Sequence, residues 1–236
     1  MSQADPIYNL SDVDFAYGPN FGLSIESLAI DAGERVACIG PSGTGKTTLI
    51  RLMTGELLPD RGTVHFDGNA VTTMPDSARR AMRCSQIGLV FQEFELVDYL
   101  TARENILLPF HLTRALQLSR AVRDRAEALA EAAGIRHTLS RLPRNLSQGE
   151  RQRVAICRAL VTRPRAILCD EPTGNLDPDT SGRVLDLLFS QASDAGAAVF
   201  MVTHNHGSLD RFDRVIDVGV LNQWQPKAAA VAGAAS

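Results

Sequence analysis

The sequence contains no run of about 18 consecutive apolar residues, so it predicts no helix that crosses a membrane. Its first ten residues, "MSQADPIYNL", have neither a basic start nor an apolar core, and we therefore expect no signal peptide. The formal net charge of −3 gives no basic excess, which argues against a dedicated nucleic-acid coat protein. With 44% hydrophobic and 22% charged residues, the sequence has the composition of an ordinary globular protein.

Cysteine is scarce, and no two of the four cysteines form a CxxC pair. They are Cys38, Cys84, Cys157 and Cys169, and three of them lie inside apolar runs. This spacing predicts reduced, mostly buried thiols in a cytoplasmic protein. We also find no internal repeat.

The 236 residues suffice for one α/β domain with a subdomain. Apolar and polar residues alternate over 7–30, which predicts antiparallel strands with one solvent-facing side. The continuous apolar run "ERVACIG" predicts a strand buried on both faces, followed by a helix over 46–55. Further strands are predicted over 63–68, 85–92, 165–172, 197–204 and 214–219, with a helix over 178–196. Strands that alternate with helices favour a mostly parallel sheet with right-handed crossovers.

Between about residues 94 and 160 the pattern becomes helical. Helices are predicted over 101–110, 119–134 and 147–161, which indicates a helical subdomain inserted into the α/β core. The final segment 225–236 has few groups able to anchor it, so we expect a single domain over 1–224 and a mobile tail.

A complete phosphate-binding pattern follows the first buried strand. "GPSGTGKT" fits G-x-x-x-x-G-K-[ST] between a strand and a helix, the context that this motif requires. Glycines let backbone N–H groups point at phosphate oxygens, and the helix dipole adds positive potential. Lys46 would reach the β- and γ-phosphates and Thr47 would bind Mg²⁺. The alternative is a ligand-free glycine-rich turn. The candidate nucleotide-binding residues here are Gly40, Pro41, Ser42, Gly43, Thr44, Gly45, Lys46, Thr47 and Thr48.

Two acids end the buried strand predicted over 165–172. Asp170 would hold Mg²⁺ beside the phosphate-binding loop, and Glu171 would orient or deprotonate the attacking water. The alternative is that the two acids merely finish a strand.

A second anion site is predicted at "NLSQGERQRV". Ser147 can cap the helix that begins at Gln148, and the free N–H groups of that helix end point outward. Arg151 and Arg153 follow, for which a solvated basic face is favoured over phosphate contact.

Together these segments resemble the ATP-binding cassette (ABC) ATPases. "LSQGE" is similar to the signature motif of that family, and it lies upstream of "RAILCDEPTGNLD" as the family's signature does. Gln92 matches the Q-loop, the "NLD" of residues 175–177 matches the D-loop, and His204 matches the switch histidine. Tyr17 lies where the family places an aromatic ring against adenine. The resemblance extends to about Val218.

The resemblance implies a P-loop NTPase core with a mostly parallel sheet, an N-terminal antiparallel β-subdomain and an inserted helical subdomain. It implies that ATP and Mg²⁺ bind between two head-to-tail domains, as a homodimer or with a paired ABC ATPase. Lys46 and Asp170 would act from one protomer, and Ser147 and Gly149 from the other. The implied catalytic residues are Glu171, His204 and Gln92, the implied metal ligands are Thr47, Gln92 and Asp170, and Asp177 is expected at the dimer seam.

Several of these matches have an ordinary structural alternative. Tyr17 could be a strand-end aromatic, Gln92 a surface amide and His204 a satisfied core histidine, while His206 is expected on the polar surface. The sequence departs from the family at Gln148, where glycine is common, so its side chain must point away from the nucleotide. It also departs at position 205, where asparagine replaces a common acid.

Within the family, "QEFELVDYLTARENILLP" and "DEPTGNLD" are most similar to the lipoprotein-release, macrolide-export and FtsE-like branch. That branch works with a membrane subunit of few spans, which implies a location on the cytoplasmic face of the inner membrane. The segment 93–109, from Glu93 to Pro109, would form the docking surface, since it carries Phe94, Leu96, Val97, Tyr99 and Leu100. The alternative is that these apolar groups pack inside the helical subdomain.

Two other hypotheses explain less of the sequence. A soluble ABC ATPase that acts on DNA or ribosomes is disfavoured by the net charge, which argues against a nucleic-acid partner. It is also disfavoured because only about fifty residues, without sustained heptads, separate Gln92 from Ser147. A P-loop kinase would leave "LSQGE", "NLD" and His204 unexplained. Cargo and transport direction are not predicted.

Overall fold

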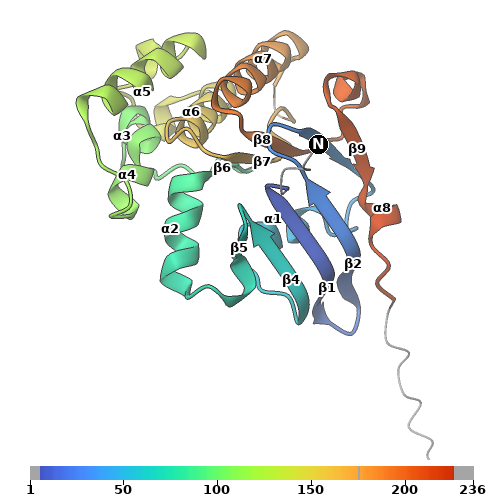
Figure 1. The fold of residues 1–236 in the computed structure, drawn as a ribbon. Helices are drawn as coiled ribbons and strands as arrows, with labels where there is room; N and C mark the ends of the chain where they lie inside the picture. The colour runs from blue at the N-terminus through green and yellow to red at the C-terminus, as the bar shows by residue number, and fades with distance from the viewer. Residues whose placement is uncertain (1–5, 175, 226–236) are drawn as a thin grey trace, which may run out of the picture.

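A computed structural model describes residues 6–174 and 176–225. The amino-terminal part forms an antiparallel sheet that pairs in the order β2-β1-β4-β5 (Figure 1). One side of this sheet is buried, with Leu10 opposite Leu28 and Val13 opposite Ile25 across the β1–β2 pair. The predicted antiparallel subdomain with one solvent-facing side is therefore confirmed. Its strands are β1 (Tyr8–Gly18), β2 (Phe21–Ile30), β4 (Arg61–Phe66) and β5 (Asn69–Ala70).

The second sheet is parallel throughout and has the order β6-β7-β8-β3-β9. Every residue of β7 and β8 is buried, which explains why both strands are continuous apolar runs in the sequence. Because the strands are parallel, their carboxyl ends meet at one edge of the sheet. The strands are β3 (Arg35–Ile39), β6 (Ile87–Val90), β7 (Ala166–Asp170), β8 (Ala198–Val202) and β9 (Arg214–Asp217).

The core helices connect these strands. The predicted helices after the phosphate-binding loop and after the D-loop are present. Helix α2 was not predicted, because it is polar overall and Met82 is its one buried residue. The helical and 3₁₀ segments are α1 (Lys46–Met53), η1 (Val71–Thr73), α2 (Asp76–Gln86), α7 (Pro178–Ala195), η4 (His206–Arg211) and α8 (Val218–Leu221).

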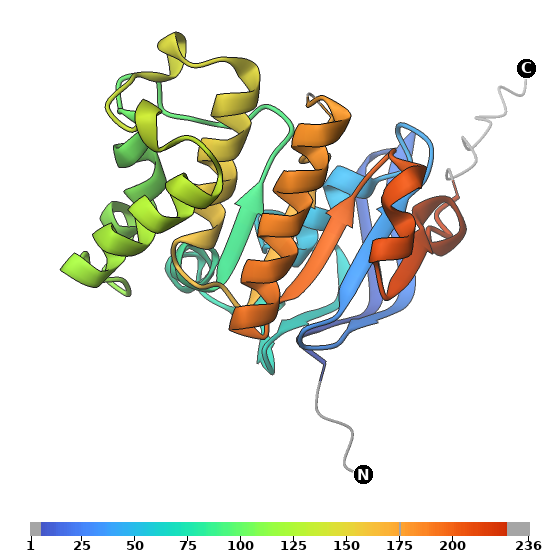
Figure 2. The same ribbon diagram turned by 90° about the horizontal axis from the view of Figure 1, so that it is seen from above.

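The inserted helical subdomain lies beside the sheet core (Figure 2). One predicted helix is split in two, because Pro109 lacks the N–H that would continue the helical hydrogen bonds after Leu108. The subdomain elements are α3 (Ala102–Leu107), α4 (Pro109–Leu112), α5 (Arg120–Ala132), η2 (Arg136–Thr138), η3 (Pro143–Asn145) and α6 (Gln148–Leu160).

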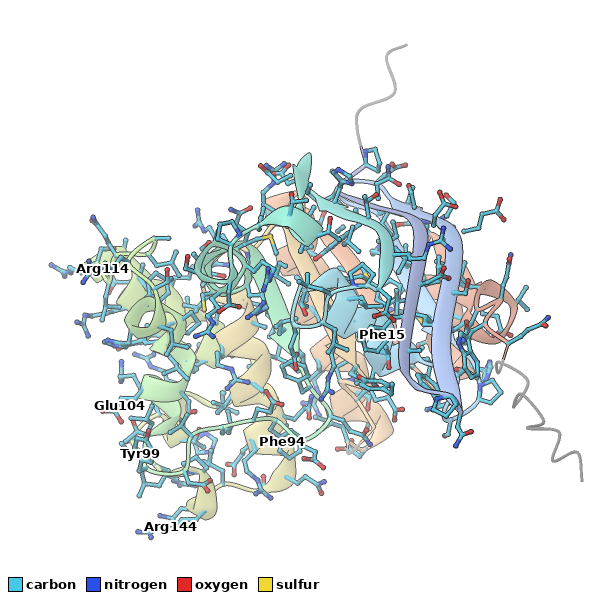
Figure 3. All side chains as sticks on the ribbon, turned by 90° about the horizontal axis from the view of Figure 1, so that it is seen from below. Phe15, Phe94, Tyr99, Glu104, Arg114 and Arg144 are labelled. Atoms are coloured by element: carbon cyan, nitrogen blue, oxygen red, sulfur yellow. The ribbon has the colours of Figure 1, made fainter. Side chains whose placement is uncertain are left out.

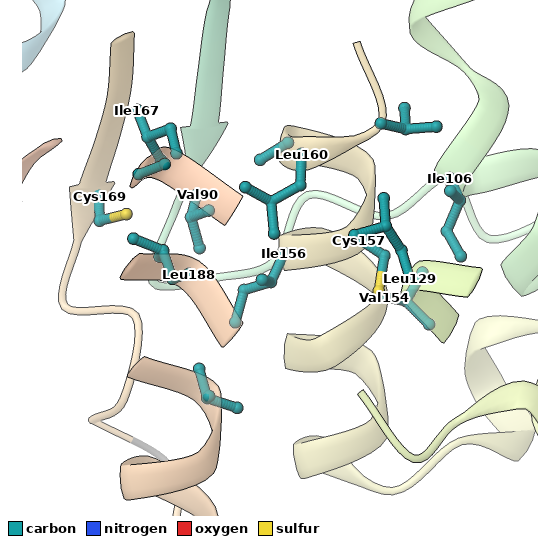
Figure 4. Packing of buried hydrophobic residues seen from close by; sticks show 14 of the residues in the cluster. Val90, Ile106, Leu129, Val154, Ile156, Cys157, Leu160, Ile167, Cys169 and Leu188 are labelled. Atoms are coloured by element: carbon teal, nitrogen blue, oxygen red, sulfur yellow. The ribbon is translucent and has the colours of Figure 1, made fainter. Parts of the chain in front are cut away.

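Helix α6 joins the subdomain to the sheet. Its Val154 and Cys157 lie near Ile106 of α3 and Leu129 of α5, and Ile156 lies on the side nearer the sheet and α7 (Figure 4). All of these residues belong to one continuous apolar core. The orientation of α6, and hence of the signature motif at its start, is thus fixed by packing on both sides.

The cysteines are as the sequence predicts. Cys38, Cys157 and Cys169 are buried, Cys84 is partly exposed, and all four are free thiols. Burial raises the pKa of Cys38 and of Cys157 to about 12. Within residues 6–174 and 176–225, no helix has the length and apolar character needed to cross a membrane. Residues 226–236 of the predicted tail lie outside the described part of the chain.

Candidate functional site

The parallel sheet gathers the predicted catalytic groups at its carboxyl edge. The phosphate-binding loop follows β3, Gln92 follows β6, Asp170 and Glu171 end β7, and His204 follows β8. These groups surround a pocket of about 270 Å³. Such an edge is where open α/β sheets bind ligands. The residues lining the pocket are Phe21, Ser42, Gly43, Gly45, Lys46, Thr47, Thr48, Gln92, Asp170, Glu171 and His204.

Glycines give the loop a backbone conformation that other residues rarely adopt. Gly43 has a φ of 82° and Gly45 a φ of 105°. At Gly45 a Cβ atom would also lie 2.9 Å from Leu23 Cδ1, so a larger residue is excluded by both conformation and space. Gly45 caps α1 without any side-chain hydrogen bond, which leaves the N–H groups of the first turn open to an anion.

Lys46 is only 7% exposed, and its ammonium group is held inside the loop. Its Nζ donates to the carbonyl oxygens of Gly40 at 2.8 Å and Pro41 at 2.9 Å. An ammonium has three N–H donors, so within the described residues one remains for a ligand. Gly40 and Pro41 therefore shape the site through their carbonyl groups, although neither lines the pocket.

A hydroxyl and a carboxylate meet beside the loop. Thr47 Oγ1 donates to Asp170 Oδ2 at 2.7 Å, and Asp170 is nearly buried at the end of β7. Within the described ranges no three His, Cys, Asp or Glu side chains form a complete metal site. Mg²⁺ needs no such cage, since it binds one or two protein oxygens together with water and substrate phosphates. The Thr47–Asp170 pair fits that ion.

Glu171 occupies a strained position at the end of β7. Its φ is 50°, in the left-handed region that non-glycine residues seldom adopt, and its backbone N–H donates to Val202 O at 3.0 Å. Its carboxylate Oε1 lies 3.0 Å from His204 Nε2. His204 is about half exposed, so it is not a satisfied core histidine, and the exposed Gln92 lies on the same pocket.

The signature segment lies at the exposed amino end of α6. The Ser147 hydroxyl accepts from the Glu150 N–H at 3.2 Å, and Glu150 accepts from the Ser147 N–H at 2.7 Å. The Ser147 backbone bond is the largest influence that lowers the pKa of the Glu150 carboxyl. Gln148 is exposed, and neither Ser147 nor Gly149 is among the described residues that line the pocket.

The two arginines after the signature are less solvated than the sequence predicted. Arg151 and Arg153 are partly buried, and the Arg151 guanidinium lies 5.6 Å from the centre of the Phe94 ring. The sequence could not show this contact, because it joins α6 to a segment more than fifty residues earlier.

The predicted dimer-seam segment is described in part. Asp177 caps α7 by accepting from Thr180 N at 3.0 Å, and its hydrogen bonds with Thr180 lower the pKa of its carboxyl. Asn175 lies outside the described residues. Asn205 accepts from Gly207 N at 3.0 Å and so caps η4, a local role that an acid could also perform. His206 is exposed, as predicted.

The aromatic residue at the pocket is not the one singled out from the sequence. Tyr17 is 56% exposed, meets Phe15 edge-on with ring centres 4.8 Å apart, and does not line the pocket. Phe21, which was not predicted as a site residue, does line it. The pairing register of β1 and β2 shifts between Ala16 and Gly18, and no local pattern in the sequence reveals which ring then faces the loop.

Comparisons with known proteins agree with this geometry. The sequence model of the ABC transporter family matches residues 23–174. An uncharacterized ABC transporter ATP-binding protein of Mycobacterium tuberculosis is 40% identical over 217 residues, which cover 90% of this chain and 87% of the relative. The lipoprotein-releasing system ATP-binding protein LolD of Psychrobacter arcticus is 41% identical over 187 residues, 79% of this chain and 82% of LolD.

Solved structures of similar fold belong to the same family. The dimeric structure of the ATP-binding cassette MJ0796, in a post-hydrolysis state bound to ADP and Pi, has a TM-score of 0.81 and 32% sequence identity. The match covers 90% of this chain and 95% of that one. The fold and family predicted from the sequence are thereby confirmed. The chain belongs to the ABC transporter family and is an ATP-hydrolysing subunit that resembles LolD.

Proposed function

We propose that two copies of this chain, or this chain and a paired ABC ATPase, bind ATP between them and drive a separate membrane subunit. The observation that carries the proposal is the separation of two anion-binding elements. Lys46 and its loop line one pocket, whereas the exposed amino end of α6 at Ser147 lies outside it. A head-to-tail partner would bring its Ser147 and Gly149 to the ATP held by this chain.

The charged side chains of the pocket, together with Thr47, Gln92 and the loop backbone, then have roles in hydrolysis. The third N–H of Lys46 and the free backbone N–H groups of the loop bind phosphate oxygens. Thr47 and Asp170, joined at 2.7 Å, would hold Mg²⁺ together with Gln92, and the ion would neutralise phosphate charge. Glu171 accepts a proton from the attacking water, and His204, 3.0 Å away, fixes the orientation of that carboxylate and contacts the γ-phosphate.

The composite site predicts how activity depends on protein concentration. Because a lone protomer lacks half of its site, phosphate release per protomer is expected to rise with protein concentration until dimers saturate. The measurement is Mg²⁺-dependent phosphate release over a dilution series, with mass from light scattering at each step. A constant rate per protomer from a chain that stays monomeric would contradict the proposal.

The docking surface for the membrane subunit is a mostly apolar groove of about 300 Å³. Its walls come from α2, β6, α4 and the end of α6, and the predicted docking segment contributes Glu95, Leu108 and Pro109. Phe94 packs between the subdomain and the core, whereas Tyr99 is 82% exposed on the outer side of the subdomain (Figure 3). The predicted segment is therefore partly interior and partly surface.

One groove residue connects docking to the nucleotide pocket. Arg158 donates to the carbonyl oxygens of Phe94 at 2.8 Å and Glu95 at 2.6 Å. Both of these residues have positive φ, 62° and 46°, and they lie two and three residues after Gln92. A partner that presses on the groove would act on these two strained residues. Only Glu93 separates them from Gln92, which lines the ATP pocket.

Cys84 offers a native probe of docking. It lines the groove and is the one partly exposed thiol, while burial raises the pKa of Cys38 and Cys157 to about 12. Maleimide is therefore expected to label Cys84 first, and the rate is expected to fall to a small fraction once the membrane subunit is bound. Mass spectrometry after timed labelling measures this, with Cys84→Ser as the control. An unchanged rate in the assembled complex would place the docking surface elsewhere.

Similarity to one branch of the family indicates which process ATP hydrolysis would drive. Similarity to LolD, which its name assigns to a lipoprotein-releasing system, favours export, extraction or mechanical transmission by the membrane subunit. The chain would then act at the cytoplasmic face of the inner membrane through that subunit.

A further inference from the structure

The segment after α8 packs against the nucleotide site. Trp224, the one tryptophan of the sequence, lies directly on the backbone of β2. A Cβ atom built at Gly22 would lie 2.1 Å from Trp224 Nε1, so only glycine allows this close approach. The ring centre of Trp224 lies 6.4 Å from that of Phe21, which lies 5.9 Å from that of Tyr17. Phe21 is thus the middle ring of a row of three.

Asn222 connects this segment to two parts of the site with one side chain. Its Oδ1 accepts from Ser24 N at 2.9 Å and from Trp224 N at 3.0 Å. Its Nδ2 donates to Gly22 O at 3.1 Å and to Thr44 O at 3.3 Å. An asparagine side chain offers two donors and two acceptor lone pairs, so all four are used. We call Asn222 and Trp224 the C-terminal clasp.

The side-chain NH₂ group of Asn222 bridges the phosphate-binding loop and β2. Thr44 belongs to that loop, and Gly22 directly follows Phe21 in β2. The loop and β2 also lie close together, since a Cβ atom built at Gly45 would lie 3.4 Å from Phe21 Cζ. The clasp therefore holds the start of β2, which carries Phe21, at a fixed position relative to the loop.

Phe21 is placed to contact the nucleoside. It is the one Phe, Tyr or Trp residue among the described residues that line the pocket. The loop, Lys46 and Thr47 take the phosphates, so a nucleotide held there carries its base away from these groups. An aromatic ring on the pocket wall binds a base by stacking, whatever the base.

We propose that Phe21 contacts the base of the bound nucleotide and that Asn222 is a positioning residue that sets the distance between this ring and the phosphate-binding loop. The proposal rests on the ATP site described above. It gives the C-terminal segment a role in nucleotide affinity, since the loop would move relative to Phe21 without the two Asn222 N–H groups.

The test compares two ligands and three variants of the full chain. Mg²⁺–ATP and base-free inorganic triphosphate are titrated while Trp224 fluorescence is recorded, with competition against labelled ATP as a second readout. Phe21→Leu keeps most of the volume and is expected to weaken ATP binding about tenfold, as loss of one stacked ring does, and to leave triphosphate binding unchanged. Asn222→Asp keeps the acceptor but removes both N–H donors, and is expected to weaken ATP binding about tenfold and triphosphate binding less, since the triphosphate does not reach Phe21.

Gln223→Glu is the matched control, because it adds the same charge at an exposed neighbouring position. It is expected to bind ATP as the wild type does and to melt at the same temperature. For Asn222→Asp, KM for ATP is expected to rise while kcat stays near the wild-type value, a split that general unfolding would not produce. If both Phe21→Leu and Asn222→Asp bound ATP with wild-type affinity, this inference would be overturned, but the proposed function would stand. A wild-type chain that binds neither ligand would overturn the proposed function itself.

Discussion

Replacing Glu171 with glutamine is expected to reduce ATP hydrolysis by about 10² to 10⁴-fold, the range that loss of a general base produces. The substitution keeps the length and shape of the side chain. The amide can still lie beside His204 Nε2, which the carboxylate meets at 3.0 Å, but it cannot take a proton from water. Lys46, Thr47 and the loop are untouched, so ATP binding is expected to persist.

A dimer that cannot hydrolyse ATP also cannot reopen by hydrolysis. Glu171→Gln with ATP is therefore expected to accumulate as a dimer, while the same variant without nucleotide stays mainly monomeric. Phosphate release and light scattering measure the two effects. Glu26→Gln, at an exposed position of β2, is the control and is expected to behave as the wild type. Wild-type turnover by Glu171→Gln would remove Glu171 from the role of base.

The sequence predicted those parts of the site that lie within one continuous segment. The loop from Gly40 to Thr47 follows a buried strand and begins a helix, so the residues of this segment alone are enough to predict its structure. Asp170 ends a strand that is apolar throughout, and the common edge of a parallel sheet explains why it meets Thr47. Neither conclusion needed knowledge of distant packing.

The parts that the sequence missed depend on contacts between distant segments. The register shift in the β1–β2 hairpin determines which aromatic ring lines the pocket. Trp224 contacts Gly22, which lies about two hundred residues earlier in the sequence. The burial of Arg151 against Phe94 likewise needs the angle at which α6 packs. Periodicity reports which face of an element is apolar, but it does not report what that face meets.

Replacing Ser147 with arginine tests whether one protomer completes the site of the other. Ser147 is exposed at the start of α6 and lies outside the pocket, so the change is expected to leave ATP binding to the same protomer within about twofold. In the dimer the arginine would occupy the space of the partner's γ-phosphate and separate it from the N–H groups of α6. Hydrolysis is then expected to fall more than about a hundredfold, as when oriented donors are lost from a transition state.

Loss of the helix cap alone would destabilise the subdomain by about 1 kcal/mol, so a control must reproduce that loss elsewhere. Ser119→Arg does so, because Ser119 caps α5 by accepting from Val122 N at 3.3 Å. It removes an equivalent cap and adds the same bulk and charge on a helix away from the signature. It is expected to retain most of the wild-type hydrolysis, and an equal loss in both variants would mean that Ser147 acts through stability only.

Mixing two inactive variants gives the sharpest form of the test. Lys46→Ala removes the ammonium of one half-site, and Ser147→Arg blocks the other half-site. Random pairing of equal amounts makes about half of the dimers mixed, and each mixed dimer has one intact site of two. Activity is therefore expected to recover to at most about a quarter of the wild-type rate, from variants that are each inactive. Mixed dimers that form and stay inactive would show that Lys46 and Ser147 do not serve one ATP from opposite protomers. Recovery could arise only from a site that the two chains build together.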